Sequence, residues 1–323
     1  MSSSTSPTQS SPIKNVALVG ANGSLGSVIL RALLESNRFH VSILRRLSST
    51  SSLPPDLEAN PALSILTVSD AWEEDELAEA LKGQDAVIAA FPVRRVEEHI
   101  ALANAAYKSE TVRRFIPADF GSVDARSPLA RSLLPLFERK VVIRKRLEDL
   151  AARSVSDGNR QEFSWTSLVN GHFFDWGLTN GFLHFYPGEK RAEILGSGNE
   201  RSSTTTLGKV TEAVIRILHD RLEESRNRVL MIQSFCVSQL DVLASVDRVT
   251  GQKWKVSYED TERFIARHKA LADGGDKESI EDLVFALGVV DGNWETKEDL
   301  AMGLLGLEEE DLDTEVRKAL GRN

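Results

Sequence analysis

The chain of 323 residues carries a formal net charge of −9 and contains a single cysteine, Cys236. One cysteine excludes an intrachain disulfide framework and suits a reducing compartment. An acidic chain without a long basic run would repel a polyanion, so the composition argues against nucleic acid as a partner.

The first twelve residues are rich in serine, threonine and proline and contain neither a hydrophobic run nor an arginine. This composition is typical of a disordered tail and differs from that of signal and transit peptides. No apolar segment of about 18 residues follows, so we expect neither a membrane span nor a membrane partner. We therefore expect a cytoplasmic protein.

An apolar run, Val16 to Val19, leads into the motif Gly20-x-x-Gly23-x-x-Gly26. In a dinucleotide-binding turn, one glycine permits the tight turn, another the approach of a pyrophosphate, and another close packing of the helix on the sheet. The helix N-terminus then holds the phosphates through unpaired N–H groups and its dipole. No Gly-Lys-Ser/Thr sequence follows, which argues against a nucleoside triphosphatase. The predicted cofactor-binding residues here are Gly20, Asn22, Gly23, Ser24, Leu25 and Gly26.

Apolar runs and amphipathic segments alternate from Asn15 onward. The runs predict strands at 39–44, 63–68, 85–90, 114–116, 163–169 and 228–233, and the amphipathic segments predict helices at 24–36, 73–81, 96–107, 129–153 and 207–219. This alternation is typical of an α/β protein with a doubly wound parallel Rossmann sheet covered on both faces. The rest of the chain predicts a smaller α+β domain that caps the sheet.

The strand at 39–44 delivers Arg45 and Arg46 to its carboxyl end, where a Rossmann site holds the adenosine ribose. An acidic residue there would bind the ribose hydroxyls of NAD, whereas an arginine offers a planar fork to the 2′-phosphate of NADP. A solvated basic pair is the alternative interpretation. We predict that the cofactor is NADP(H) and that Arg45 binds its 2′-phosphate.

Other strands of the predicted sheet also end in segments that should face the cofactor, because a Rossmann ligand lies outside the carboxyl ends of the strands. The residues predicted to contact the cofactor there are Ala90, Phe91, Pro117, Ala118, Asp119, Phe120 and Asn170.

The basic helix predicted at 129–153 contains Lys140, which helical spacing places on one side with Phe137, Ile143 and Arg144. Proton transfer by a lysine requires burial or a cationic neighbour to lower its pKa from about 10.4. Neither the i+3 nor the i+4 position of this lysine is acidic. We therefore expect Arg144 and partial burial to lower the pKa of Lys140. From the pattern alone, a solvated lysine is the alternative.

Four landmarks agree in order and spacing with one family of proteins. They are Gly20-x-x-Gly23-x-x-Gly26, the arginine after the second strand, Phe115-Ile116-Pro117-Ala118-Asp119-Phe120-Gly121, and Lys140-x-x-x-Arg144 ending in Leu147-Glu148. The likeness extends through Val169-Asn170-Gly171-His172-Phe173-Phe174 and the glycine turn Leu195-Gly196-Ser197-Gly198-Asn199. Together these segments resemble the NmrA-like, isoflavone-reductase-like branch of the atypical short-chain dehydrogenases. The resemblance implies that Lys140 is a catalytic acid/base, a residue that regulatory relatives which sense NADP without turnover tend to lack.

Aromatic and histidine side chains crowd together after the strand at 163–169. They are His172, Phe173, Phe174, Trp176, Phe182, Phe185 and Tyr186. Because Phe, Trp and Tyr make up only 7% of the chain, this density either lines a pocket for a flat apolar ligand or packs the core of the smaller domain. The residues that we predict to bind substrate are Gly171, His172, Phe173, Phe174 and Trp176.

These observations divide the chain into three predicted parts. Residues 1–12 are a disordered tail, residues 13–165 with 204–236 form the NADP-binding Rossmann domain, and residues 166–203 with 237–323 form the substrate-binding domain. The six histidines lack metal-ligand spacing, so no metal is expected. The expected partner is a small, aromatic substrate, and we expect a monomer or a homodimer.

The predicted function is that of an enzyme, an NADPH-dependent reductase of a small aromatic or specialised metabolite. Hydride comes from the nicotinamide and the proton is handled through Lys140. Two alternatives remain open from the sequence. One is a regulator that senses NADP without turnover, and the other is an isomerase or dehydratase without net hydride transfer.

Overall fold

The computed structural model describes residues 12–156, 162–295 and 297–322, so the predicted tail lies almost wholly outside the described residues. Its largest element is a sheet of seven parallel strands in the order β11-β6-β5-β4-β1-β2-β3. The strands are β1 (Asn15–Val19), β2 (His40–Arg46), β3 (Leu63–Val68), β4 (Ala86–Ala89), β5 (Arg114–Ile116), β6 (Ser164–Val169) and β11 (Arg228–Met231). This sheet confirms the predicted Rossmann architecture.

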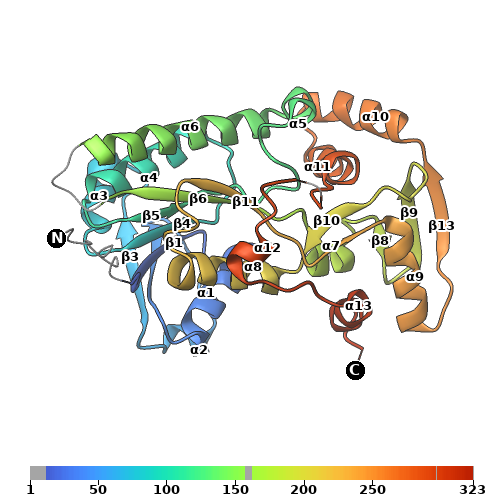
Figure 1. The fold of residues 1–323 in the computed structure, drawn as a ribbon, viewed down its shortest axis with the longest axis horizontal. Coiled ribbons are helices and arrows are strands. Elements are labelled where there is room, and N and C mark those ends of the chain that lie inside the picture. The colour runs from blue at the N-terminus through green and yellow to red at the C-terminus, as the bar shows by residue number, and fades with distance from the viewer. Residues whose placement is uncertain (1–11, 157–161, 296, 323) are drawn as a thin grey trace, which may run out of the picture.

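Helices cover both faces of this sheet (Figure 1). On one face lie α3 (Glu74–Ala80), α4 (Val96–Lys108) and α6 (Pro135–Ser156); on the other lie α1 (Ser24–Glu35), α2 (Pro55–Glu58), α8 (Leu207–Ile215), its π-helical continuation η1 (Arg216–Asp220) and α12 (Met302–Leu305). Side chains alternate along each strand, so Val16 and Leu18 pack on the α1 side while Ala17 and Val19 pack on the α4 side. The sheet therefore carries two separate hydrophobic cores.

The prediction of a single helix at 129–153 is wrong, because the structure contains two helices there, α5 (Pro128–Leu133) and α6. Between them, Leu134 is extended, with φ −134° and ψ 122°. Pro135 explains the break, since a proline disfavours the helical conformation in the residue before it yet is tolerated at the first position of a new helix.

A smaller α+β part packs beside the carboxyl ends of the main strands (Figure 1). Its two three-stranded sheets contain β7 (His172–Phe173), β8 (Phe185–Tyr186), β9 (Arg191–Leu195), β10 (Ser202–Thr205), β12 (Phe235–Val237) and β13 (Lys255–Glu259). Its helices are α7 (Phe174–Asn180), α9 (Gln239–Thr250), α10 (Thr261–Asp273), α11 (Lys277–Asp291) and α13 (Leu312–Ala319). A third core, centred on Phe174, Phe185 and Phe285, holds these elements together.

Residues 299–307 return to the main sheet, although the predicted boundary assigned them to the substrate-binding domain. Met231 of β11 donates its N–H to Asp299 at 2.9 Å and accepts one from Ala301 at 2.8 Å. Leu305 and Leu307 are buried in the core on the α1 side of the sheet. This part of the boundary is therefore corrected, and the other predicted domain limits remain predictions.

Candidate active site

The glycine turn after β1 has the geometry that its motif predicts at two of its three glycines. Gly20 has φ +87°, and a Cβ there would lie 2.4 Å from the carbonyl oxygen of Ala90. A Cβ on Gly26 would lie 2.0 Å from the carbonyl oxygen of Gly20. Both positions therefore exclude any larger residue. At Gly23 the nearest atom to an added Cβ is 3.4 Å away, so the protein leaves space on that side of the turn.

The N-terminus of α1 carries Gly23 as its capping residue, which has no side chain to accept the first N–H groups of the helix. The first turn also contains no acidic residue. The uncapped N–H groups and the positive end of the helix dipole therefore remain available to an anion. Ser24 and Leu25, predicted to bind the cofactor, supply two residues of this turn.

A hollow of about 390 Å³ lies beside the glycine turn, between the ends of β1 and β2 and the residues that follow β3 and β4. The predicted cofactor residues that line it are Gly20, Asn22, Gly23, Arg45 and Phe91. Other residues that line the hollow were not predicted to bind the cofactor. They are Ala21, Arg46, Ser48, Ser49, Ser51 and Trp72, together with the apolar ends of β1 and β2. Gly26 and Ala90 support the turn from behind through the close approaches to Gly20.

The two arginines at the end of β2 differ in their partners. Arg46 forms an ion pair with Glu98 at 3.1 Å, and its guanidinium lies 4.6 Å from the centre of the Trp72 ring. Arg45 makes only a 3.4 Å hydrogen bond to the carbonyl oxygen of Ser51 and has no ion-pair partner among the described residues. Arg45 is thus the arginine whose charge is free for a ligand in this hollow.

Trp72 holds a conformation that the sequence did not reveal. Its φ is +60°, which is unusual for a bulky residue and marks a specialised position. The indole N–H donates to the carbonyl oxygen of Glu98 at 3.0 Å, and the ring meets Phe91 edge to face. Phe91 in turn stacks on His99 with 3.9 Å between ring centres. A series of ring contacts therefore leads from the hollow to His99.

Lys140 lies on the inner side of α6 and is 8% exposed, so the alternative of a solvated lysine is wrong. Its Nζ donates to the carbonyl oxygen of Asp119 and stands 3.8 Å from Asp119 Oδ1. Arg144 donates from Nε to Asp119 Oδ2 at 2.5 Å and from Nη1 to Asp124 at 2.6 Å. Ser167 also donates to Asp119 Oδ2. The buried carboxylate of Asp119 thus forms ion pairs with two basic side chains.

Burial lowers the pKa of Lys140 below its usual value, while the Asp119 carboxylate raises this pKa and the Arg144 charge lowers it. The expected direction agrees, and the i+3 and i+4 positions on the helix are indeed not acidic, but a carboxylate from outside the helix opposes the shift. Asp119 reaches the lysine from another segment, at the end of β5, so helical spacing along α6 could not reveal it. Asp119 is itself 3% exposed and pairs with Lys140 and Arg144, while its Oδ1 makes no hydrogen bond within the described part of the protein. Its contact with a cofactor remains a prediction.

The remaining predicted cofactor residues meet around Lys140. Pro117 and Ala118 lie beside it, on the segment that leaves β5. Phe120 has φ +34° and turns this segment toward Gly121, whose carbonyl oxygen accepts the N–H of Asn170 at 3.2 Å. Asn170 is fully buried at the end of β6, and its side-chain oxygen has no hydrogen-bond partner in the protein. An unpaired buried oxygen at this edge of the sheet suits a ligand that brings a donor.

The predicted substrate residues divide into two groups. His172 and Phe174 are buried in the smaller part, beside a cavity of only about 30 Å³, and a Cβ on Gly171 would overlap Ser203. That cavity is too small for an aromatic ring, and in this structure the three residues pack between elements of the smaller part. Their contact with substrate remains a prediction. Phe173 and Trp176 are half-buried and keep accessible surface.

Among the described residues, no helix is both long and apolar enough to cross a membrane. Nor does any group of three histidine, cysteine or acidic residues in that part of the chain lie close enough to hold a metal ion.

A sequence model of the NmrA-like family matches residues 12–289. The chain belongs to the NmrA-like family. This membership agrees with the resemblance in the glycine motif and in Lys140-x-x-x-Arg144.

Named relatives of this NmrA-like protein include oxidoreductases. Oxidoreductase aprR of Aspergillus flavus is 38% identical over 248 residues, which cover 76% of this chain and 77% of the relative. Isoflavone reductase of Pisum sativum is 23% identical over 265 residues, 77% of this chain and 80% of the relative. Among solved structures, the binary complex of leucoanthocyanidin reductase with NADPH from Vitis vinifera has a TM-score of 0.76 at 15% identity, covering 95% of this chain and all of that one. The similarity in structure shows a shared fold.

Proposed function

We propose that this oxidoreductase of the NmrA-like family uses NADPH to reduce a small aromatic metabolite, with Lys140 handling the proton. The observation that carries the proposal is the buried Lys140 amine, which lies beside the ends of β5 and β6 in the same protein as an uncapped, glycine-rich nucleotide turn. In a Rossmann protein the reacting end of a bound dinucleotide lies at such strand ends.

Three features of the hollow suit NADP(H). The N-terminus of α1 is free to receive the pyrophosphate, Gly23 leaves room for it, and Arg45 is free to bind the 2′-phosphate. Phe91 is only partly buried, so its ring is available to contact an aromatic part of the ligand. NADPH would supply a hydride. Several relatives are named reductases or oxidoreductases, and one solved neighbour is a complex with NADPH.

The protein's own part in the reaction is proton management at Lys140 Nζ. A buried amine with a lowered pKa exchanges protons more readily near neutral pH than an exposed lysine does. Asp119 orients it by accepting a hydrogen bond at its main-chain oxygen. Reduction of a polar double bond consumes one proton, which in this proposal Lys140 Nζ donates and then recovers from solvent.

The substrate proposal rests on the accessible aromatic surface of Phe173 and Trp176 near the end of β6. A flat ligand would stack against these rings. One solved structural neighbour is AtPrR2 with NADP+ and (+)-pinoresinol. We further propose that the enzyme acts in the cytoplasm, as a monomer or a homodimer.

The decisive experiment is an NADPH-oxidation assay across aromatic enones, allylic esters and imines, with Lys140→Met as the test variant. We expect the variant to bind NADPH within a few fold of the wild type and to lose at least about a hundredfold in turnover. Lys108→Met, which removes an exposed lysine at the end of α4, is the matched control and should retain full turnover. Retention of full turnover by Lys140→Met, or tight NADPH binding without turnover of any acceptor, would favour the regulator instead.

A further inference from the structure

The strand β13 has one side that no other strand covers. It is the outer strand of the sheet β13-β9-β8 and lies at the end of the molecule away from the main sheet (Figure 1). The N–H of Lys255 and the carbonyl oxygen of Glu259 form hydrogen bonds of 2.8 Å with residues that flank β9. Because the main-chain groups of a strand point alternately to its two sides, Val256 and Tyr258 direct theirs to the uncovered side. No strand in the described part of the chain pairs with that side.

The apolar face of this sheet continues onto β13 and is uncovered there. Val256 lies in register with Ala192 of β9, and Tyr258 lies in register with Ile194. Residues in register on parallel strands share a face of the sheet. Ala192 and Ile194 are buried in the core of the smaller part, whereas Val256 is 38% exposed and Tyr258 is 62% exposed. The last strand therefore presents apolar surface that the protomer does not cover.

The sequence of β13 is complementary to itself when it is read in the opposite direction. It is Lys255-Val256-Ser257-Tyr258-Glu259. A two-fold axis at Ser257 would place Lys255 opposite Glu259 of a second copy, and Val256 opposite Tyr258 of that copy. Val256 and Tyr258 are also the residues whose main-chain groups face the uncovered side, so they would exchange the hydrogen bonds of an antiparallel pair.

The charges of β13 favour this arrangement over an isolated edge. Lys255 has no ion-pair partner among the described residues, and its neighbour in register on β9 is Arg191, a like charge. Glu259 pairs with Arg267 at 2.9 Å and its side chain is still 30% exposed. A lysine on an edge strand opposes pairing with another strand unless an acidic residue faces it. The antiparallel register supplies that acidic residue at both ends.

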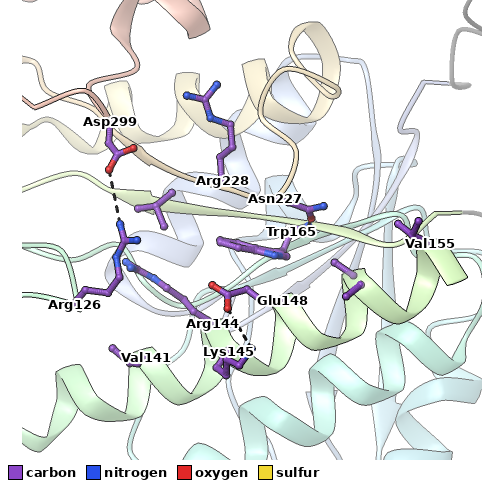
Figure 2. A pocket seen from close by; sticks show the side chains of 13 residues that line it. Arg126, Val141, Arg144, Lys145, Glu148, Val155, Trp165, Asn227, Arg228 and Asp299 are labelled. Carbon is purple, nitrogen blue, oxygen red and sulfur yellow. Dashed lines mark hydrogen bonds and ion pairs between the residues drawn. The ribbon is translucent and has the colours of Figure 1, made fainter.

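Other uncovered surfaces of the molecule lack this complementarity. The outer strand β3 (Leu63–Val68) contains no charged residue. The groove of about 700 Å³ between α6 and the strands β6 and β11 carries charges of both signs, which pair within the protomer (Figure 2). Glu148 lies 3.8 Å from Lys145, and Asp299 lies 3.8 Å from Arg126.

We propose that β13 pairs with β13 of a second copy of this chain, in an antiparallel homodimer with two-fold symmetry. The two small sheets then form one continuous sheet, and the exposed apolar side chains cover each other across the axis. Because a strand of five residues is only about 17 Å long, the interface is small and the dimer is weak and reversible. This pairing does not rest on the proposed reductase activity.

Sedimentation velocity over a concentration series from low micromolar to several hundred micromolar tests the pairing. We expect a monomer–dimer equilibrium in the wild type. Lys255→Glu and Glu259→Lys should each weaken the dimer by about tenfold or more, because like charges then face each other at both ends of the strand pair. The double variant exchanges the two charges and should restore the dimer. Lys277→Glu, at an exposed position that begins α11, is the control and should leave the equilibrium unchanged.

A cross-link tests the position of the axis. In an antiparallel pair without mutual hydrogen bonds the two Cα atoms lie about 4.5 Å apart, which a disulfide can bridge. Ser257→Cys should therefore form a covalent dimer under mild oxidation. The native Cys236 is buried, so the wild type should remain uncross-linked. Ser64→Cys, on the exposed part of β3, is the matched control and should give little covalent dimer.

Three results would overturn the proposal. They are a monomer at every concentration, a dimer that both single charge reversals leave intact, and a double variant that stays as dissociated as the single ones. Melting temperatures near that of the wild type show that the variants fold. None of these outcomes depends on turnover, so the proposed reductase activity stands or falls separately.

Discussion

At the scale of single residues, the carboxylate of Asp119 interacts with two basic side chains, those of Lys140 and Arg144. Its Oδ2 accepts from Arg144 and Ser167, whereas its Oδ1 is buried without a hydrogen bond and lies 3.8 Å from Lys140 Nζ. Burial favours the neutral amine of Lys140 and the nearby carboxylate favours the charged form. Under the proposed mechanism, the balance between these two effects sets the pH range in which Lys140 transfers a proton.

Asp119→Asn should move the alkaline limit of activity to lower pH. Removing the carboxylate takes away the interaction that raises the pKa of Lys140, so the amine loses its proton earlier as pH rises. A reduction that needs the protonated amine then fails at lower pH. The measurement is kcat against pH or, without a substrate, the NMR titration of Nζ in protein labelled with ¹⁵N-lysine. Asp75→Asn, at an exposed carboxylate on α3, is the control, and a shift to higher pH in Asp119→Asn would contradict the assignment.

Arg45→Asp should reverse or erase a preference for NADPH over NADH. The wild type should bind NADPH at least tenfold more tightly, about 1.4 kcal/mol, because a charge-assisted pair forms with the 2′-phosphate. In the variant a carboxylate faces that phosphate and repels it. Fluorescence titration with both nucleotides measures the ratio. Equal affinities in the wild type would exclude Arg45 from this role.

At the scale of elements, the segment that begins at His172 has two different faces. Phe174 is fully buried and meets Phe235 edge to face with 4.7 Å between ring centres. Trp176, two residues later on α7, is half-buried and lies 5.6 Å from the Phe182 ring. The same helix thus anchors the core of the smaller part and presents aromatic surface outside it.

Phe174→Ala and Trp176→Ala should therefore have different effects. The first removes a ring from a packed core and should lower the free energy of unfolding by about 3–5 kcal/mol. The second should leave the melting temperature nearly unchanged and raise KM for an aromatic substrate. Denaturant unfolding and steady-state kinetics on the same proteins measure both. A large loss of stability in Trp176→Ala would assign that ring to packing as well.

Gly288→Ala should destabilise the protein, although alanine normally stabilises the interior of a helix by about 1 kcal/mol relative to glycine. Gly288 lies within α11, and an added Cβ would stand 2.0 Å from His172 Nε2. Because the histidine is buried between Phe285 and Phe182, it has little room to move, and the clash outweighs the helix propensity. Gly208→Ala in α8 is the control, since its Cβ would meet nothing closer than 3.8 Å. Urea unfolding that ranks Gly288→Ala at or above the wild type would contradict this packing.

At the scale of the whole molecule, buried histidines couple stability to pH. Burial lowers the pKa of both His99 and His172 from 6.5 to about 4. Between these values the unfolded chain binds protons that the native protein does not, so stability falls as the pH decreases from about 6.5 toward 4. Each residue can contribute up to about 3 kcal/mol to this loss.

His172→Gln should accordingly flatten the dependence of unfolding free energy on pH between pH 7 and 5, because its side chain takes up no proton in the unfolded chain. Urea unfolding at both pH values provides the measurement. The quantity compared is the difference in unfolding free energy between pH 7 and pH 5. A general loss of stability in the variant lowers both values and so leaves this difference unaffected. His40→Gln, at an exposed histidine, should leave the difference as in the wild type. An unchanged difference in His172→Gln would show that this residue is not the source.

Local sequence alone determined much of the nucleotide-binding half. Apolar runs, amphipathic periods and three glycines predict β1, the turn and α1, because these features depend on neighbours within a few residues. The same local signals located Arg45 at the end of β2 and Lys140 on one side of a helix. Both side chains lie where these signals predicted them, although the role of each remains a proposal.

Only the tertiary structure decided which distant segments meet. It placed Asp119 against Lys140, Trp72 in the hollow at the glycine turn, and residues 299–307 on the edge of the main sheet. It also showed that Phe174 packs a core while Trp176 keeps accessible surface. Such contacts join segments that are far apart in the sequence. Their formation depends on how whole helices and strands pack. Residue type and spacing indicate the local conformational preference of the backbone, but they do not determine which helices and strands pack together.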